Sequence, residues 1–327
     1  MRVRIPLTCS AIVVLGMFAG AQAPKRLNPM IELMAAKKPV FGLYAPSNRR
    51  FAGASGASSA SSAPATRTPA QLAADALANT NTDFIFDGSM EGGMERALPP
   101  FTDFVKGMAV SGSFKKHNGQ LTHPLVVKMH EIAPDHKVAA ESIGKQLNLG
   151  VSGIMFVSVE SAAEAQAGIN AMRFKSKGGT RSEDVGQAPA LWGLSEKEYK
   201  EKADLWPLNP NGELINWTIV ESKEGLAKVR EIAAVKGIGV LWPGAGTLRG
   251  LFTTTDASGA RKLDEAAWEA AIQKVLAACK EFNVACGYPA NPNDIEMRIK
   301  QGFSVFVMNW GDAGFKAIEI GKKAAGR

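Results

Sequence analysis

Acidic, basic and imidazole side chains follow several short apolar runs of this 327-residue sequence. In the stretch DFIFDGSMEGG, an apolar run ends in a glycine-rich turn that carries Glu91. The next apolar run ends in Lys128, with His130 just beyond it, and a later one, TIVE, ends in Glu221. Carboxylates of this kind can hold a hard divalent cation or move a proton, and a lysine can bind an anionic group.

These residues predict acid–base and metal chemistry on a small carboxylate-bearing substrate. We assign catalytic roles to Glu91, Lys128 and His130. Lys128 and Arg49 are the candidates for binding the substrate carboxylate, and Glu221 is the candidate metal ligand. Structural alternatives stay open: a hydrogen-bonded acid for Glu91, a loop histidine for His130, a solvated basic loop for Arg49 and an ion-paired carboxylate for Glu221. A desolvated Lys128 could instead form a Schiff base with a ketone.

The apolar runs read as strands that alternate with helical patterns. Each is short and apolar on both sides, as parallel strands covered by helices are. We expect strands at 39–44, 84–86, 125–128, 153–157, 216–220, 239–242, 284–287 and 304–307, with helices at 141–146, 162–172, 223–235, 265–282 and 292–301. This order predicts an α/β fold, a single (β/α)8 TIM-type barrel, in preference to an open sheet. The candidate residues would then gather at the C-terminal ends of the strands.

Three segments stand outside this alternation. Residues 1–23 have two arginines, an apolar run and a small-x-small site, which predicts a signal peptide and an exported, periplasmic or secreted protein; a single transmembrane anchor is the alternative. The barrel domain then covers 24–327. Within it, residues 52–69 are rich in Ala, Ser and Gly and predict a flexible loop, and residues 182–213 predict an insertion over the barrel mouth, between the fourth and fifth strands.

Charge and cysteine content exclude some classes of protein. The formal charge falls from +7 to +5 when Arg2 and Arg4 leave with the signal peptide. The remaining basic residues are scattered, so we expect no nucleic-acid partner, and no membrane contact after cleavage. Cys279 lies on an apolar helix face and Cys286 in an apolar strand, which predicts two buried thiols, with a disulfide as the alternative. No cysteine or histidine spacing indicates zinc.

Several stretches resemble the HpcH/HpaI aldolase/citrate lyase family, which are metal-dependent pyruvate-type aldolases on (β/α)8 barrels. They are DFIFDGSMEGG, HPLVVKMHEIAPD, GVSGIMFVSVESAAEAQAGINAMRF with GGTR behind it, WPLNPNGELINWTIVES and GIGVLWPGAG. The resemblance runs from about residue 41 to 324. It implies a carbon–carbon lyase acting on a small oxo- or hydroxy-acid, a divalent metal (Mg or Mn) and a homo-oligomer. Glu221 matches the family's metal-binding glutamate.

The chain departs from the family pattern at three positions. The resemblance places a proton-transferring histidine where this sequence has Gly92, directly after Glu91. The second metal carboxylate falls at Gly246 or Thr247, and the arginine that steadies the substrate is here Lys128. A depleted lyase, a barrel with changed chemistry and a binding protein for a small carboxylate therefore remain as alternatives.

Overall fold

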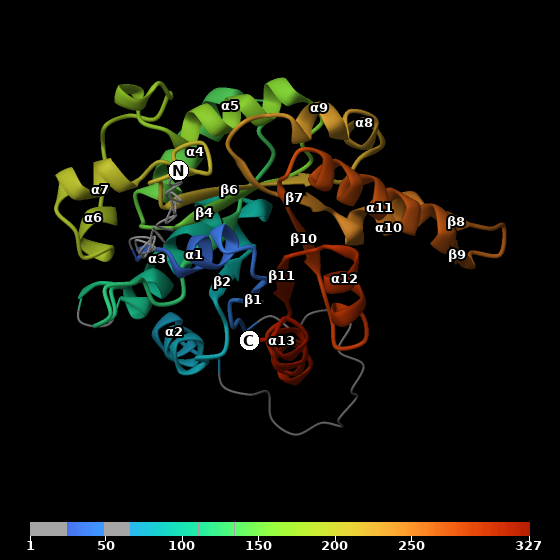
Figure 1. Cartoon of the computed structure of the whole chain (residues 1–327), viewed down its shortest axis with the longest axis horizontal. Helices are drawn as coiled ribbons and strands as arrows, with labels where there is room; N and C mark the ends of the chain where they lie inside the picture. Colours follow the sequence, from blue (N-terminus) through green and yellow to red (C-terminus); the bar gives the residue numbers. More distant parts are fainter. Residues whose placement is uncertain (1–24, 49–65, 110–111, 134) are drawn as a thin grey trace, which may run out of the picture.

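Eight parallel strands close into a barrel in the computed structural model, which describes residues 25–48, 66–109, 112–133 and 135–327. The chain forms the barrel in sequence order, and β4 pairs with β6 to close it (Figure 1). The strands are β1 (Val40–Tyr44), β2 (Phe84–Asp87), β3 (Leu125–Lys128), β4 (Gly153–Phe156), β6 (Leu214–Val220), β7 (Ile238–Pro243), β10 (Ala285–Pro289) and β11 (Val305–Met308). The predicted (β/α)8 barrel is confirmed.

Helices surround the barrel and connect its strands (Figure 1). They are α1 (Pro29–Ala35), α2 (Pro69–Ala78), α3 (Met94–Met108), α4 (His136–Leu147), α5 (Ala162–Met172), α6 (Ala188–Leu191), α7 (Glu196–Lys202), α8 (Lys223–Ala227), α9 (Val229–Ala233), α10 (Ala245–Leu251), α11 (Glu265–Glu281), α12 (Ile295–Gln301) and α13 (Asp312–Ala324). A separate hairpin, β8 (Thr253–Thr255) and β9 (Arg261–Leu263), projects from the barrel beyond α10.

Large apolar side chains fill the inside of the barrel. Trp217 of β6 stacks on Trp242 of β7, with ring centroids 5.5 Å apart, and on Phe86 of β2 at 5.9 Å. At the N-terminal end of the strands, Met30, Ile31 and Met34 of α1 pack into the same buried cluster. The inside of the barrel is therefore closed at that end, and side chains at the C-terminal ends of the strands can form a site at the mouth.

The C-terminal helix α13 packs against β1 and β11. Its buried side chains include Ala317 and Ile318, which belong to the core between barrel and helices. The apolar face of α13 is thus used within the subunit, so it gives no separate support to the predicted homo-oligomer.

The insertion between β4 and β6 lies at the opposite end of the barrel from the one predicted. Its short strand β5 (Leu205–Trp206) pairs with the first residues of β6, Leu214 and Ile215. The indole N–H of Trp192, also in the insertion, donates to the carbonyl oxygen of Gly150, just before β4. The physical reason is chain direction: the insertion follows α5, which has already returned the chain to the N-terminal ends of the strands. It does not cover the mouth.

Cys279 and Cys286 form a disulfide, which corrects the prediction of two free thiols. Cys279 lies near the end of α11 and Cys286 in β10, with Cα atoms 5.7 Å apart, within the range that a disulfide spans. Both residues are buried, as predicted. Their apolar surroundings indicated burial but not the pairing, which depends on how the turn between α11 and β10 brings the two Cβ atoms together.

Reduction of this disulfide is expected to lower the free energy of unfolding by about 2–3 kcal/mol, the loop-closure contribution for a short loop. Urea unfolding of the wild type, with and without a thiol reductant, measures the difference. The double variant Cys279→Ala/Cys286→Ala serves as control, because its unfolding midpoint should not respond to the reductant. Equal midpoints for reduced and oxidised wild type would contradict the prediction.

Three predictions concern segments at least partly outside the described residues. The signal peptide at 1–23 and Arg49 lie there entirely, and most of the loop at 52–69 does. The end of that loop is described: Thr68 caps α2. Its hydroxyl accepts a hydrogen bond from the backbone N–H of Gln71, and the side-chain oxygen of Gln71 accepts one from the backbone N–H of Thr68. Within the described residues, no helix is long and apolar enough to cross a bilayer.

Candidate active site

Lys128 and Glu91 form an ion pair at the C-terminal end of the barrel. Lys128 is the last residue of β3, and Glu91 lies in the short 3₁₀ turn after β2; these two strands are neighbours. The Lys128 Nζ atom lies 2.7 Å from Glu91 Oε1. The lysine side chain is 17% exposed and the glutamate side chain 44% exposed, so water and a small substrate can reach the pair from the side of the acid. The structure therefore brings two of the predicted residues together.

Tyr44 stands beside this pair and was not predicted as a site residue. It ends β1, the strand next to β2. Burial, together with the charges of Glu91 and Asp87, raises the pKa of the Tyr44 phenol to about 12. The phenol is therefore neutral at physiological pH and keeps an O–H group that can donate to a substrate oxygen. Its position at a strand end was the signal available in the sequence.

A cavity of about 480 Å³ opens beside these groups. Tyr44, Glu91 and Lys128 line it together with Asp87 and Arg67. The Asp87 carboxylate accepts hydrogen bonds from the backbone N–H and the hydroxyl of Ser89, which holds the turn after β2. The apolar wall of the cavity comes from α2 and α3, through residues that include Leu72, Phe101 and Phe104. A small acid would meet positive charge, a neutral phenol and an acid in one cavity.

Arg67 joins this cavity to the segment after β1. Its guanidinium donates to the carbonyl oxygen of Ser47 at 3.0 Å and to Asp75 Oδ2 of α2 at 2.6 Å. The backbone N–H of Arg67 also donates to the side chain of Asn48. Arg67 is thus a described arginine at the mouth, where the sequence pointed to Arg49.

Glu221 is buried at the same end of the barrel, directly after β6, with 6% of its surface exposed. Its Oε1 atom accepts hydrogen bonds from the backbone N–H of Ser158 at 3.1 Å and from the Ser158 hydroxyl at 3.3 Å. Ser158 follows β4 and has a φ of +50°, a conformation that few non-glycine residues adopt and that is found at functional sites. The carboxylate is therefore held in one orientation.

The second carboxylate oxygen of Glu221 faces Gly244. A Cβ atom on Gly244 would lie 2.6 Å from Glu221 Oε2 and 2.3 Å from its Cβ, so the glycine lets the Glu221 side chain pack closely against the backbone. Gly246 and Thr247, at the family's second carboxylate position, are exposed on α10 and supply no acid. Within the described residues, no group of three or more His, Cys, Asp or Glu side chains is placed to hold a metal ion. The residues fit a cation that shares Glu221 with oxygens of the substrate and water.

His130 forms its hydrogen bonds with groups outside the Lys128–Glu91 pair. Its Nε2 lies 2.9 Å from the hydroxyl of Ser142 on α4, and its Nδ1 lies 2.9 Å from the carbonyl oxygen of Glu131. The predicted role of His130 as a base therefore has no support from its position. Among the other histidines, His123 precedes β3 at the far end of the barrel, and burial lowers its pKa. The histidines do not gather into one site.

Glu221 and the cavity share one end of the barrel without sharing a wall. Glu221 is not among the described residues that line the cavity. β4 separates β3, which carries Lys128, from β6, which precedes Glu221. The mouth thus offers two neighbouring anchor points, a lysine–glutamate pair and a fixed carboxylate.

A closed parallel barrel with acidic and basic side chains at the C-terminal strand ends defines the class of (β/α)8 barrel proteins with a site at the mouth. Comparison with known protein families identifies the family. The sequence model of the HpcH/HpaI aldolase/citrate lyase family matches residues 125–314. The chain belongs to this family, as its motifs predicted.

Individual relatives are distant. The chain is 26% identical over 155 residues to a 4-hydroxy-4-methyl-2-oxoglutarate aldolase, cghB, from Chaetomium globosum, covering 47% of this chain and 54% of the relative. The chain thus matches about half the length of that aldolase. Two crystal structures share the fold. A family member from Burkholderia cenocepacia has a TM-score of 0.62 at 18% identity, covering 86% of this chain and 92% of that one. An HpcH/HpaI aldolase from Desulfitobacterium hafniense has a TM-score of 0.61 at 14% identity, covering 90% and 94%.

Proposed function

We propose that the protein is a carbon–carbon lyase of the pyruvate-aldolase type that acts on a small oxo- or hydroxy-acid with a depleted active site. The observation that carries the proposal is the Lys128–Glu91 ion pair, which lines a cavity at the mouth of the barrel beside the neutral phenol of Tyr44. Family membership supplies the reaction class.

Substrate binding would exchange one anion for another at Lys128. A substrate carboxylate takes the place of the Glu91 carboxylate against Lys128 Nζ, which keeps the positive charge of the family's arginine but lacks its two-pronged grip. Tyr44 donates its O–H to the substrate's oxygen. The released Glu91 lies on the open side of the cavity. Its carboxylate then accepts the proton of the substrate hydroxyl when the carbon–carbon bond breaks, and returns that proton to the oxygen when the bond forms.

Glu221 is the residue that would hold a divalent cation, Mg or Mn. Such an ion, when bound, supplies Lewis-acid polarisation of the keto oxygen and stabilises enolate charge. Ser158 keeps the Glu221 carboxylate in place by two hydrogen bonds, and the missing side chain of Gly244 allows the carboxylate to lie against the backbone there. Because one carboxylate alone binds such ions weakly, binding would depend on the acid substrate.

A binding protein without turnover is the second candidate. The absence of a side chain at Gly92 and of an acid at Gly246 or Thr247 favours it, since both positions carry the family's proton-transfer and metal groups in the resemblance. A barrel with changed chemistry is the third. Neither candidate alters the expected binding of a small carboxylate at Lys128.

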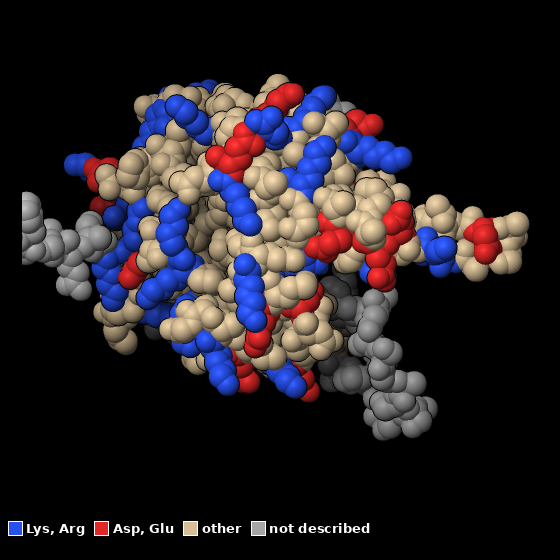
Figure 2. All heavy atoms as spheres, turned by 45° about the vertical axis from the view of Figure 1, so that its right-hand side comes forward, with Lys and Arg blue, Asp and Glu red and all other residues tan. Residues whose placement is uncertain are grey.

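Export and self-association complete the proposal. The Cys279–Cys286 disulfide supports an exported protein, because structural disulfides persist mainly in oxidising compartments. The family resemblance supports a homo-oligomer. Figure 2 shows basic side chains spread over the visible face with acidic ones among them, in keeping with the scattered charge of the sequence.

Isothermal titration of manganese into the mature protein, with and without pyruvate, tests the site. We expect manganese to bind about ten-fold or more tightly when pyruvate is present, because the acid supplies the missing oxygens. In Glu221→Gln this enhancement should disappear. Glu224→Gln is the matched control, since Glu224 lies in the exposed first turn of α8 and should leave binding unchanged.

Two results would decide against parts of the proposal. If manganese binds neither the wild type nor Glu221→Gln, with or without pyruvate, metal-dependent lyase chemistry is excluded. Only the binding of pyruvate then remains to be explained. If manganese and pyruvate bind together but no aldol donor or acceptor is turned over, the binding-protein candidate replaces the lyase.

A further inference from the structure

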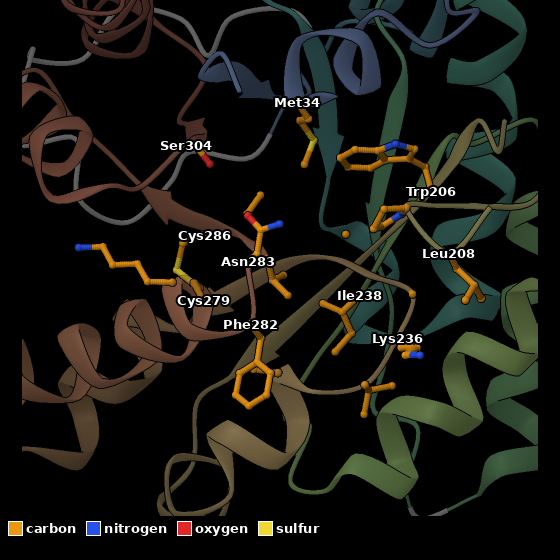
Figure 3. A pocket seen from close by; sticks show the side chains of 18 of the residues that line it. Met34, Trp206, Leu208, Lys236, Ile238, Cys279, Phe282, Asn283, Cys286 and Ser304 are labelled. Carbon is orange, nitrogen blue, oxygen red and sulfur yellow. A yellow bond between two sulfur atoms is a disulfide. The ribbon is translucent and has the colours of Figure 1, made fainter. Parts of the chain in front are cut away.

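A second and larger cavity lies at the opposite end of the barrel from the candidate active site (Figure 3). It has a volume of about 1000 Å³, ample for a drug-sized molecule. Its walls come from α1, the insertion, and the segments that lead into β7, β10 and β11. It therefore shares no residue with the cavity at the mouth.

Apolar side chains surround the hollow. Figure 3 shows Met34 of α1, Trp206 and Leu208 of the insertion, and Ile238 and Phe282 among the side chains that line it. Leu208 is 37% exposed, which makes it one of the few large apolar side chains on the described surface. Apolar surface of this kind is stabilised by an apolar ligand.

The charged side chains that line the cavity are basic. Four lysines line the cavity, and none of its described lining residues is Asp or Glu: the lysines are Lys37, Lys38, Lys236 and Lys280. All four are exposed. Glu281 follows Lys280 in the chain, but its carboxylate is paired with the guanidinium of Arg230. The rim therefore carries positive charge that no nearby lining residue neutralises.

One wall of the cavity is held rigid by covalent and polar links. The disulfide between Cys279 and Cys286 closes the turn that carries Lys280, Phe282 and Asn283, and all of these residues line the cavity. Across the rim, Lys37 Nζ of the segment after α1 donates to Asn283 Oδ1 at 3.0 Å. A wall fixed in this way loses little conformational entropy when a ligand binds.

We propose that this cavity is a second binding site, for an amphiphilic organic anion whose apolar body enters the hollow while its acidic group meets the lysines. Charge complementarity selects this occupant. The chain's own segments outside the described residues, 1–24 and 49–65, contain arginines and no Asp or Glu, so they do not complement the lysines. The proposal does not depend on the lyase function.

The fluorescent probe anilinonaphthalene sulfonate tests the site, because it combines an aromatic body with one negative charge. We expect saturable binding to the folded wild type, with displacement by decanoate and much weaker displacement by decanol. Lys236→Glu/Lys280→Glu should raise the dissociation constant of the probe about ten-fold, since it reverses two charges at the rim. Leu208→Glu, which places an acid at the exposed apolar edge, should weaken binding as well.

Lys145→Glu/Lys316→Glu is the matched control. Both lysines are exposed and lie outside the cavity lining, so the variant has the same change in net charge and should bind the probe like the wild type. An equal loss of binding in this control would mean that net charge attracts the probe, and would overturn the proposal. Binding unchanged in both cavity variants, each checked for a cooperative unfolding transition, would also overturn it. Pyruvate should not displace the probe, which separates this site from the mouth.

Discussion

Replacing Lys128 with methionine is expected to weaken the binding of pyruvate about 10- to 100-fold, the range of one charge-assisted hydrogen bond in a half-buried setting. Lys128 is the basic side chain of the ion pair in the mouth cavity, and its Nζ is 2.7 Å from the carboxylate it would release. Methionine keeps most of the stem but removes the charge. Titration calorimetry measures the loss directly and does not require turnover.

Two further variants make this experiment specific. Lys106→Met removes an equivalent charge from α3, where the Lys106 side chain is 60% exposed and pairs with Asp103, and it should leave pyruvate affinity unchanged. Lys128→Arg should bind pyruvate at least as tightly as the wild type, because a guanidinium can grip a carboxylate with two parallel hydrogen bonds. Unchanged affinity in Lys128→Met would remove Lys128 from the site and leave Arg67 as the other basic residue that lines the cavity.

The barrel strands were predictable because each is buried on both faces. An apolar run such as 125–128 or 153–157 is then visible without knowledge of its neighbours, and the polar residue that ends it marks the mouth. Helix α3 was not predicted, since Pro99 and Pro100 lie inside it. Its buried face, which includes Phe101, Phe104 and Met108, packs well enough to override the two lost backbone donors.

The strand ends in the sequence indicated some residues of the candidate site, such as Glu91 and Lys128, but not its geometry. Neighbouring strands place Glu91 beside Lys128, as their shared edge of the barrel suggested. The orientation of His130 toward Ser142, and the contribution of Tyr44, depend on side-chain packing between distant parts of the chain. Chain direction could have placed the insertion, because a segment that follows the helix after β4 must lie at the N-terminal ends of the strands.

Replacing Gly244 with alanine is expected to displace the Glu221 carboxylate and to abolish the pyruvate-dependent binding of manganese. A Cβ atom at this position would approach the Cβ of Glu221 to 2.3 Å, a distance that cannot be relieved by moving a flexible chain end. The overpacking should also lower the free energy of unfolding by about 1–3 kcal/mol. Manganese titration in the presence of pyruvate, together with urea unfolding, measures both effects.

Gly246→Ala is the control for Gly244→Ala. It shows whether a loss of manganese binding comes from displacing Glu221 or from any alanine placed near α10. No heavy atom lies within 4 Å of a Cβ built on Gly246, so this variant should bind and unfold like the wild type, or be slightly more stable because alanine favours a helix. If Gly244→Ala folds normally and still binds manganese with pyruvate, Glu221 is not the ligand and its hydrogen bonds to Ser158 are purely structural. If binding is lost in Gly244→Ala alone, the position of the Glu221 carboxylate against Gly244 is part of the site, because the added Cβ atom displaces that side chain.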